Sequence, residues 1–65
     1  MSRAPWSHFR FTCVEIFPRR YAPGWAAIVW GELETVRQVC QVCFDRDRAA
    51  VEFKAAFYAA QMETA

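Results

Sequence analysis

The chain has few of the residues that carry enzyme chemistry. Its 65 residues include two glycines and one histidine, so no glycine-rich loop can cradle a phosphate. His8 has no acidic neighbour in the sequence that would orient it as a general base. The carboxylates Glu32, Glu34, Asp45 and Asp47 fall where a turn and a helix start are expected. We therefore predict a protein that is not an enzyme and that uses no cofactor and no small-molecule substrate.

Charge of one sign and long apolar runs are also missing. Eight basic and seven acidic residues give a net charge of +1, which excludes a phosphate mimic and a polybasic nucleic-acid binder. No segment approaches the ~20 apolar residues of a membrane span, and the start lacks the apolar run of a signal peptide. The three cysteines are an odd number, so they cannot form a complete internal disulfide set. We expect a cytoplasmic protein, in the host cytoplasm if a phage encodes it.

Apolar and aromatic residues are abundant instead. The hydrophobic share is 55% and the aromatic share 17%. A domain of roughly 60 residues buries only about 60% of the surface that its unfolded chain exposes, so part of this apolar surface must meet something else. Another protein surface is the simplest candidate. We expect either a protein partner or a second copy of the chain.

The first half of the chain predicts two strands. Residues 8–12 alternate polar and apolar side chains, as a half-buried strand does, and the phase slips after Cys13, which indicates a bulge there. Residues 25–30 are apolar at every position, which is typical of a central strand covered on both faces. Gly31 is expected to end this strand and to open a tight turn.

Residues 33–44 are ambiguous. Three valines in this stretch favour a strand, but Leu33, Val36, Cys40 and Cys43 recur at helical spacings. We favour the strand.

Residues 45–62 are rich in alanine and contain no proline or glycine, so they predict a helix capped by Asp45 or Asp47.

The expected fold is a single α+β domain over residues 1–65. A three-stranded antiparallel sheet is followed by one C-terminal helix (β-β-β-α), and residues 1–7 form an irregular leader. The alternative is a β-hairpin with two helices.

The predicted helix carries two apolar stripes. We expect one to pack on the sheet and the other to lack a cover inside so small a domain. The stripe expected to face the sheet contains Ala50, Phe53, Phe57 and Ala60, and the stripe expected to be uncovered contains Val51, Ala55, Tyr58 and Met62.

Cysteine spacing raises the alternative of a zinc site. Cys40 and Cys43, together with Cys13 and His8, could be written as a Cys3His ligand set. However, valines rather than turn residues surround the pair, and strand residues three apart point to opposite faces. We predict that the cysteines are structural thiols and that the protein holds no metal.

Arginine and tryptophan on the expected sheet raise the alternative of DNA binding. The segment from Trp25 into the helix resembles, in its order of elements, the plant ethylene-response-factor type of DNA-binding domain and integrase N-terminal domains. This resemblance implies a sheet laid in a DNA groove, with Arg10 and Arg37 as the contact residues. The strands lack the dense basic residues of those families, and Gln38 and Gln41 are neutral.

In length, composition and lack of catalytic motifs, the whole chain resembles small phage and mobile-element proteins of the anti-CRISPR type. The resemblance implies a non-enzymatic inhibitor that sterically blocks a host defence complex, with a protein or nucleoprotein complex as its partner. Aromatic and arginine side chains dominate binding hot spots. The residues predicted to bind the partner are Arg19, Arg20, Tyr21, Trp25, Trp30, Val51, Tyr58 and Met62.

Overall fold

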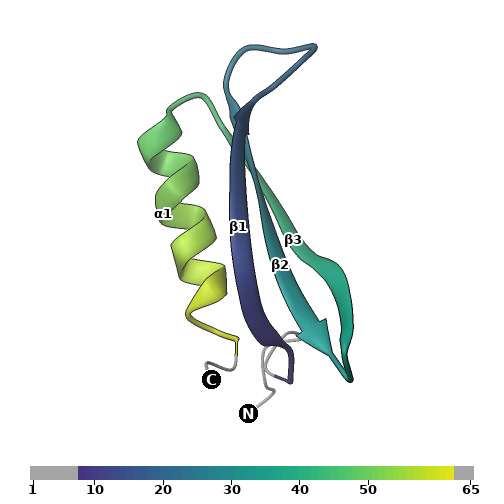
Figure 1. Ribbon diagram of the computed structural model, residues 1–65. Coiled ribbons are helices and arrows are strands. Elements are labelled where there is room, and N and C mark those ends of the chain that lie inside the picture. Colours follow the sequence, from purple (N-terminus) through teal and green to yellow (C-terminus); the bar gives the residue numbers. More distant parts are fainter. Residues whose placement is uncertain (1–7, 63–65) are drawn as a thin grey trace.

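Three antiparallel strands and one helix make up the part of the chain that the computed structural model describes, residues 8–62. The predicted leader lies outside these residues. The elements are β1 (Arg10–Pro18), β2 (Trp25–Leu33), β3 (Val36–Asp45) and α1 (Arg48–Ala59). The helix lies along one face of the sheet (Figure 1). The predicted β-β-β-α fold is confirmed, and the hairpin with two helices is excluded because residues 36–45 form a strand.

The apolar run of residues 25–30 forms the middle of the sheet, because the strands are ordered β1-β2-β3. The predicted turn at Gly31 is wrong. Gly31 lies inside β2, where Met62 packs directly over it and leaves no room for a Cβ atom. The turn comes later, at Glu34 and Thr35, which have positive φ angles of 52° and 69°. Two-residue type I′ hairpin loops require positive φ at both positions.

Each edge strand, β1 and β3, contains a β-bulge that shifts its pairing register with β2 by one residue. The predicted bulge near Cys13 is confirmed, because the register between β1 and β2 shifts between Phe11 and Cys13. A second shift was not predicted. In the β2–β3 pair, Val29 lies opposite Gln41 and Trp30 opposite Val39, so the register shifts by one residue at Cys40. Residues on either side of such a bulge share a face at a spacing of three rather than two.

Two residues, Arg46 and Asp47, separate the end of β3 from the start of α1. Asp47 occupies the N-cap position with an extended backbone, and its side chain makes no capping hydrogen bond. The Asp47 N–H instead donates to Asp45 Oδ1 at 3.1 Å. This bond, and a second one from Lys54, lower the pKa of the Asp45 carboxyl. Asp47 therefore occupies the predicted N-cap position but does not cap the helix with its side chain, and the Asp45 carboxylate stabilises the turn between β3 and α1.

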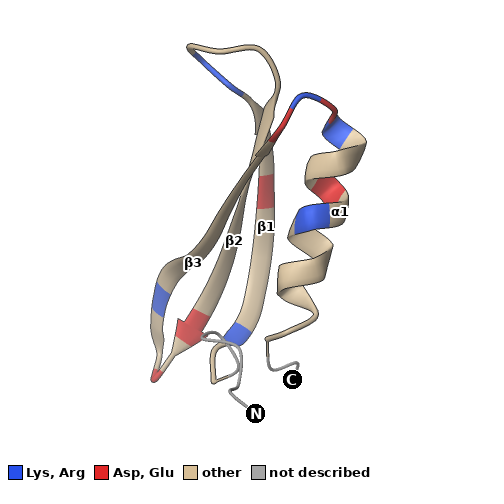
Figure 2. Cartoon of the chain, turned by 180° about the vertical axis from the view of Figure 1, so that it is seen from behind, with Lys and Arg blue, Asp and Glu red and all other residues tan. Residues whose placement is uncertain are grey.

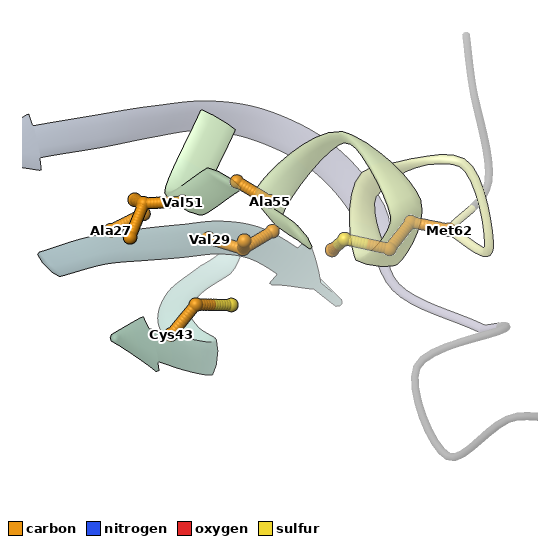
Figure 3. Close-up of a cluster of buried hydrophobic side chains, with 6 residues drawn as sticks. All are labelled: Ala27, Val29, Cys43, Val51, Ala55 and Met62. Atoms are coloured by element: carbon orange, nitrogen blue, oxygen red, sulfur yellow. The ribbon is translucent and has the colours of Figure 1, made fainter. Parts of the chain in front are cut away.

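The core lies between α1 and the strands β2 and β3 (Figure 3). Small side chains on both elements let the helix approach closely. The buried residues that form this cluster are Ala27, Val29, Cys43, Val51, Ala55 and Met62.

The helix therefore faces the sheet with the stripe that was expected to be uncovered. Val51 is 0% exposed, whereas Phe53 and Phe57 are 76% and 58% exposed. The expectation is corrected: Val51, Ala55 and Met62 pack with Ala27 and Val29 of β2, and the short side chains of Ala27 and Ala55 let the helix lie close to the sheet. The larger aromatic stripe is left on the surface.

Candidate functional site

The face of the sheet turned away from α1 forms four cross-strand rows. We call this surface the open face. From the end near the β1–β2 loop to the opposite end, the rows are Phe17–Ala26–Phe44, Glu15–Ile28–Val42, Cys13–Trp30–Val39 and Arg10–Glu32–Arg37. The first three rows are apolar except for Glu15, so a continuous apolar surface covers most of the sheet.

No described element covers this surface. Phe17, Val39, Val42 and Phe44 are all exposed, with Phe44 51% accessible, and α1 contacts the other face. An antiparallel sheet that is covered on one side normally turns polar side chains to water on the other. The expectation that β2 is covered on both faces is therefore met only on the helix side within residues 8–62. Contiguous apolar patches are rare on monomeric soluble proteins and are found at interaction sites.

Each charged side chain of the open face interacts with another residue of the same face, through a hydrogen bond, an ion pair or a cation–π contact. Glu15 accepts a hydrogen bond from Trp30 Nε1 at 2.6 Å, and the Arg37 guanidinium lies 4.8 Å from the centre of the Trp30 ring. Arg10 forms an ion pair with Glu32. The middle stretches of β2 and β3 carry no charge (Figure 2). The apolar side chains are therefore the main groups available to a partner.

The β1–β2 loop extends the open face at one end. The Arg19 guanidinium lies 4.7 Å from the centre of the Phe44 ring, and Tyr21 is 92% exposed. The loop and the first row of the open face enclose a hollow of about 270 Å³. Its lining includes Phe17, Arg19, Arg20, Tyr21, Ala26 and Phe44. A hollow lined by rings and guanidinium groups can receive one side chain of a partner.

The structure brings four of the eight predicted partner-binding residues to this surface. Arg19, Arg20 and Tyr21 line the hollow, and Trp30 lies at the centre of the third row. Trp25 lies on the opposite side, where its ring packs against the core cluster and the Arg48 guanidinium lies 5.1 Å from it.

The three residues predicted on the helix of residues 45–62 lie away from the open face, with Met62 beyond the end of α1. Tyr58 is half-buried beside Phe57, with the two ring centres 5.4 Å apart. Val51 and Met62 are buried in the core. Their assignment to a binding surface is corrected, because a buried side chain cannot contact a partner without unfolding the domain.

The sequence reasoning missed five apolar residues of the open face. These residues are Phe17, Ile28, Val39, Val42 and Phe44. Phe17 could have been found by following the alternation from Cys13 along β1, and Ile28 by following it back from Trp30 along β2. Val39 and Val42 could not, because the bulge at Cys40 gives them a spacing that also occurs on a helix face.

The cysteines lie on both sides of the sheet. Cys13 is on the open face, where the Arg37 guanidinium donates to its sulfur at 3.2 Å. Cys40 and Cys43 both pack toward α1, since the bulge turns Cys40 to the same side as Cys43. Burial raises the pKa of both thiols, which favours the protonated form over the thiolate that binds metals. No cluster of three potential ligands occurs among residues 8–62.

No protein-family model, curated protein or solved structure matches this chain. In residues 8–62, no helix is long and apolar enough to span a membrane. What the protein binds must therefore be inferred from the surfaces of its own fold.

Proposed function

We propose that this protein is a non-enzymatic binding module that attaches to a partner protein through the open face and the adjoining β1–β2 loop. The observation that carries this proposal is the apolar character of a sheet face that α1 does not cover. The module acts by occupying a surface that the partner needs for another contact. Its action requires no chemistry beyond binding.

The composition of the surface supports protein binding. Aromatic and arginine side chains are enriched at protein interfaces, and charged residues are depleted at interface cores. Trp30 and Phe44 are the central anchors, and Arg19 and Tyr21 lie at the margin. The apolar rows form the interface core, and the Arg10–Glu32–Arg37 row forms a polar rim.

We further propose that the module is a phage-type inhibitor of a host defence complex, acting in the host cytoplasm. Length, composition and the absence of catalytic motifs support this class. The open face adds a ready contact surface to that argument. A protein subunit of the complex, rather than its nucleic acid, is the partner that an apolar surface selects.

DNA binding is the weaker proposal. The two arginines expected to contact DNA are both engaged, Arg10 with Glu32 and Arg37 with the Trp30 ring. Nucleic-acid affinity comes largely from unpaired basic groups that neutralise phosphates. The valine, isoleucine and phenylalanine side chains between these arginines and the loop offer nothing to a phosphate backbone.

Substitution of one open-face residue tests the proposal. The wild-type protein is used to capture partners from host lysate, and a captured protein is purified for affinity measurements. Phe17→Glu places a charge in the first row, where a desolvated contact is expected, and should weaken binding by at least about 100-fold, as loss of a hot-spot residue does. Ala49→Glu, on the exposed surface of α1, is the control and should leave the affinity unchanged.

The two variants must first show the same melting temperature as the wild type within a few degrees. Equal affinity of Phe17→Glu and wild type would contradict the assignment of binding to the open face. Loss of binding in Ala49→Glu alone would show that the partner binds α1 rather than the open face.

A further inference from the structure

The helix lies off the middle of the sheet, towards the β3 edge. Its buried residues contact Ala27 and Val29 on β2 and Cys43 on β3 (Figure 3). On β1, Phe11, Val14 and Ile16 are only partly buried at the margin of this cluster. The side of the domain where β3 forms the edge therefore has helix and strand close together.

On that side, a groove of about 480 Å³ runs between β3 and α1. Its walls are largely aromatic and aliphatic. The lining includes Val42, Cys43, Phe44, Phe53, Phe57 and Tyr58. Lys54 also lines it and is bonded to Asp45 Oδ2 at 3.0 Å, so the one charged side chain of this groove already has its counterion.

The backbone of β3 is open beside this groove. Two carbonyl groups of this edge accept side-chain hydrogen bonds: Gln41 Nε2 donates to Val42 O at 3.2 Å, and Lys54 Nζ donates to Phe44 O at 2.9 Å. Since residues two apart in a strand direct their carbonyls to the same side, both carbonyls are assigned to the outer side of β3. β3 itself contains no proline or lysine, but the bulge at Cys40 and the Lys54 ammonium on Phe44 O both protect its edge. The stretch of β3 after the bulge can accept another strand once the Gln41 and Lys54 side chains move aside.

We propose that two copies of the chain pair antiparallel through β3 about a two-fold axis normal to the sheet. The spacing of the elements supports this arrangement. Paired strands lie about 4.8 Å apart, so a helix placed over β2 and β3 lies about 5 Å from such an axis. The two symmetry-related helices are then about 10 Å apart, which matches the 8–10 Å of packed helices.

The pairing accounts for the exposed aromatic stripe of α1. Phe53 and Phe57 of each copy face the groove of the other, as an isologous interface requires. A buried aromatic side chain covers 150–250 Å², so four partly exposed phenyl groups contribute roughly 500 Å². That is about half of the ~1,000 Å² expected of a specific interface, and the paired strands and Tyr58 supply further area.

The dimer joins two open faces into one six-stranded surface, with Val42 and Phe44 of both copies near the axis. This inference goes beyond the proposed function and stands without it. A complex with the partner protein is then expected to contain two copies of this chain, bound as a dimer, rather than one.

Sedimentation velocity from about 1 to 200 µM tests the pairing. The wild-type protein should convert from monomer to a species of twice its mass over this range. Phe53→Glu should weaken self-association at least 100-fold. Val42→Pro should do the same without unfolding the domain, because an edge residue whose N–H points outward tolerates proline.

Phe17→Glu is the matched control, because it places the same charge on the open face of the far strand β1. It should leave self-association unchanged while removing partner binding, so failure of one proposal can be told from failure of the other. A monomer at every concentration would overturn the inference. So would a dimer that survives Phe53→Glu and is lost in Phe17→Glu, which would indicate packing of two open faces.

Discussion

Val51→Asp should unfold the domain, whereas Phe53→Asp, two residues along the same helix, should leave the monomer folded. Val51 is fully buried against the sheet. An aspartate there is a charge without a partner, and such substitutions destabilise by more than about 4 kcal/mol. A 65-residue domain has a total stability of roughly 3–10 kcal/mol, so most of it would be lost.

Phe53 is the larger apolar residue, but its side chain is largely in water. Its replacement should change the free energy of unfolding by less than about 1 kcal/mol. Circular dichroism and urea unfolding at low micromolar concentration, where any dimer is dissociated, measure both variants. A folded Val51→Asp together with an unfolded Phe53→Asp would show that the helix packs on its other stripe.

Gly24→Ala should lower the stability of the domain by roughly 2–4 kcal/mol. Gly24 has φ of 112°, a conformation that costs an alanine about 1–3 kcal/mol. A Cβ atom would also lie 2.7 Å from the carbonyl oxygen of Asp45, so the backbone at the end of β3 would have to move. Since 1 kcal/mol shifts the melting temperature by about 4–8 °C in a domain of this size, the expected drop is at least about 10 °C.

Tyr21→Ala is the control for this prediction, because Tyr21 lies in the same loop with its side chain almost fully exposed. Its melting temperature should equal that of the wild type. Differential scanning calorimetry on both variants decides the matter. A Gly24→Ala protein as stable as the wild type would show that the loop does not approach Asp45 in solution.

Local patterns were enough to predict the elements and their order. The apolar run of residues 25–30 indicated the central strand, and the phase slip at Cys13 indicated a bulge. The helix was predicted from alanine content and the lack of breakers. Each of these signals depends on neighbours in the sequence, and sequence patterns report such neighbours directly.

The orientation of the helix could not be predicted in the same way. Both stripes are apolar, and the pair of phenylalanines looks more like a core than Val51 and Ala55 do. The orientation depends on packing against β2, where Val51 and Ala55 lie with Ala27 and Val29 and Met62 lies over Gly31. That information lies in the pairing of two distant segments.

The open face was hidden for a related reason. The register shift at a single residue, Cys40, changes which side chains of β3 share a face. Without it, Val39 and Val42 would point to opposite sides, and Val39 would lie on the side of α1. The sequence therefore indicated an excess of apolar surface but not its place, and the bulge determines that place.

Photo-cross-linking from the open face tests the central proposal most directly. A diazirine analogue of phenylalanine replaces Phe44, which is half-exposed on that face, and in a second protein replaces Ala49 on the outer surface of α1. After illumination in host cells, the Phe44 position should give a discrete adduct with one other protein that protease removes and nuclease does not, and the Ala49 position should give none. A nuclease-sensitive adduct at Phe44, or the same protein adduct from both positions, would contradict the account.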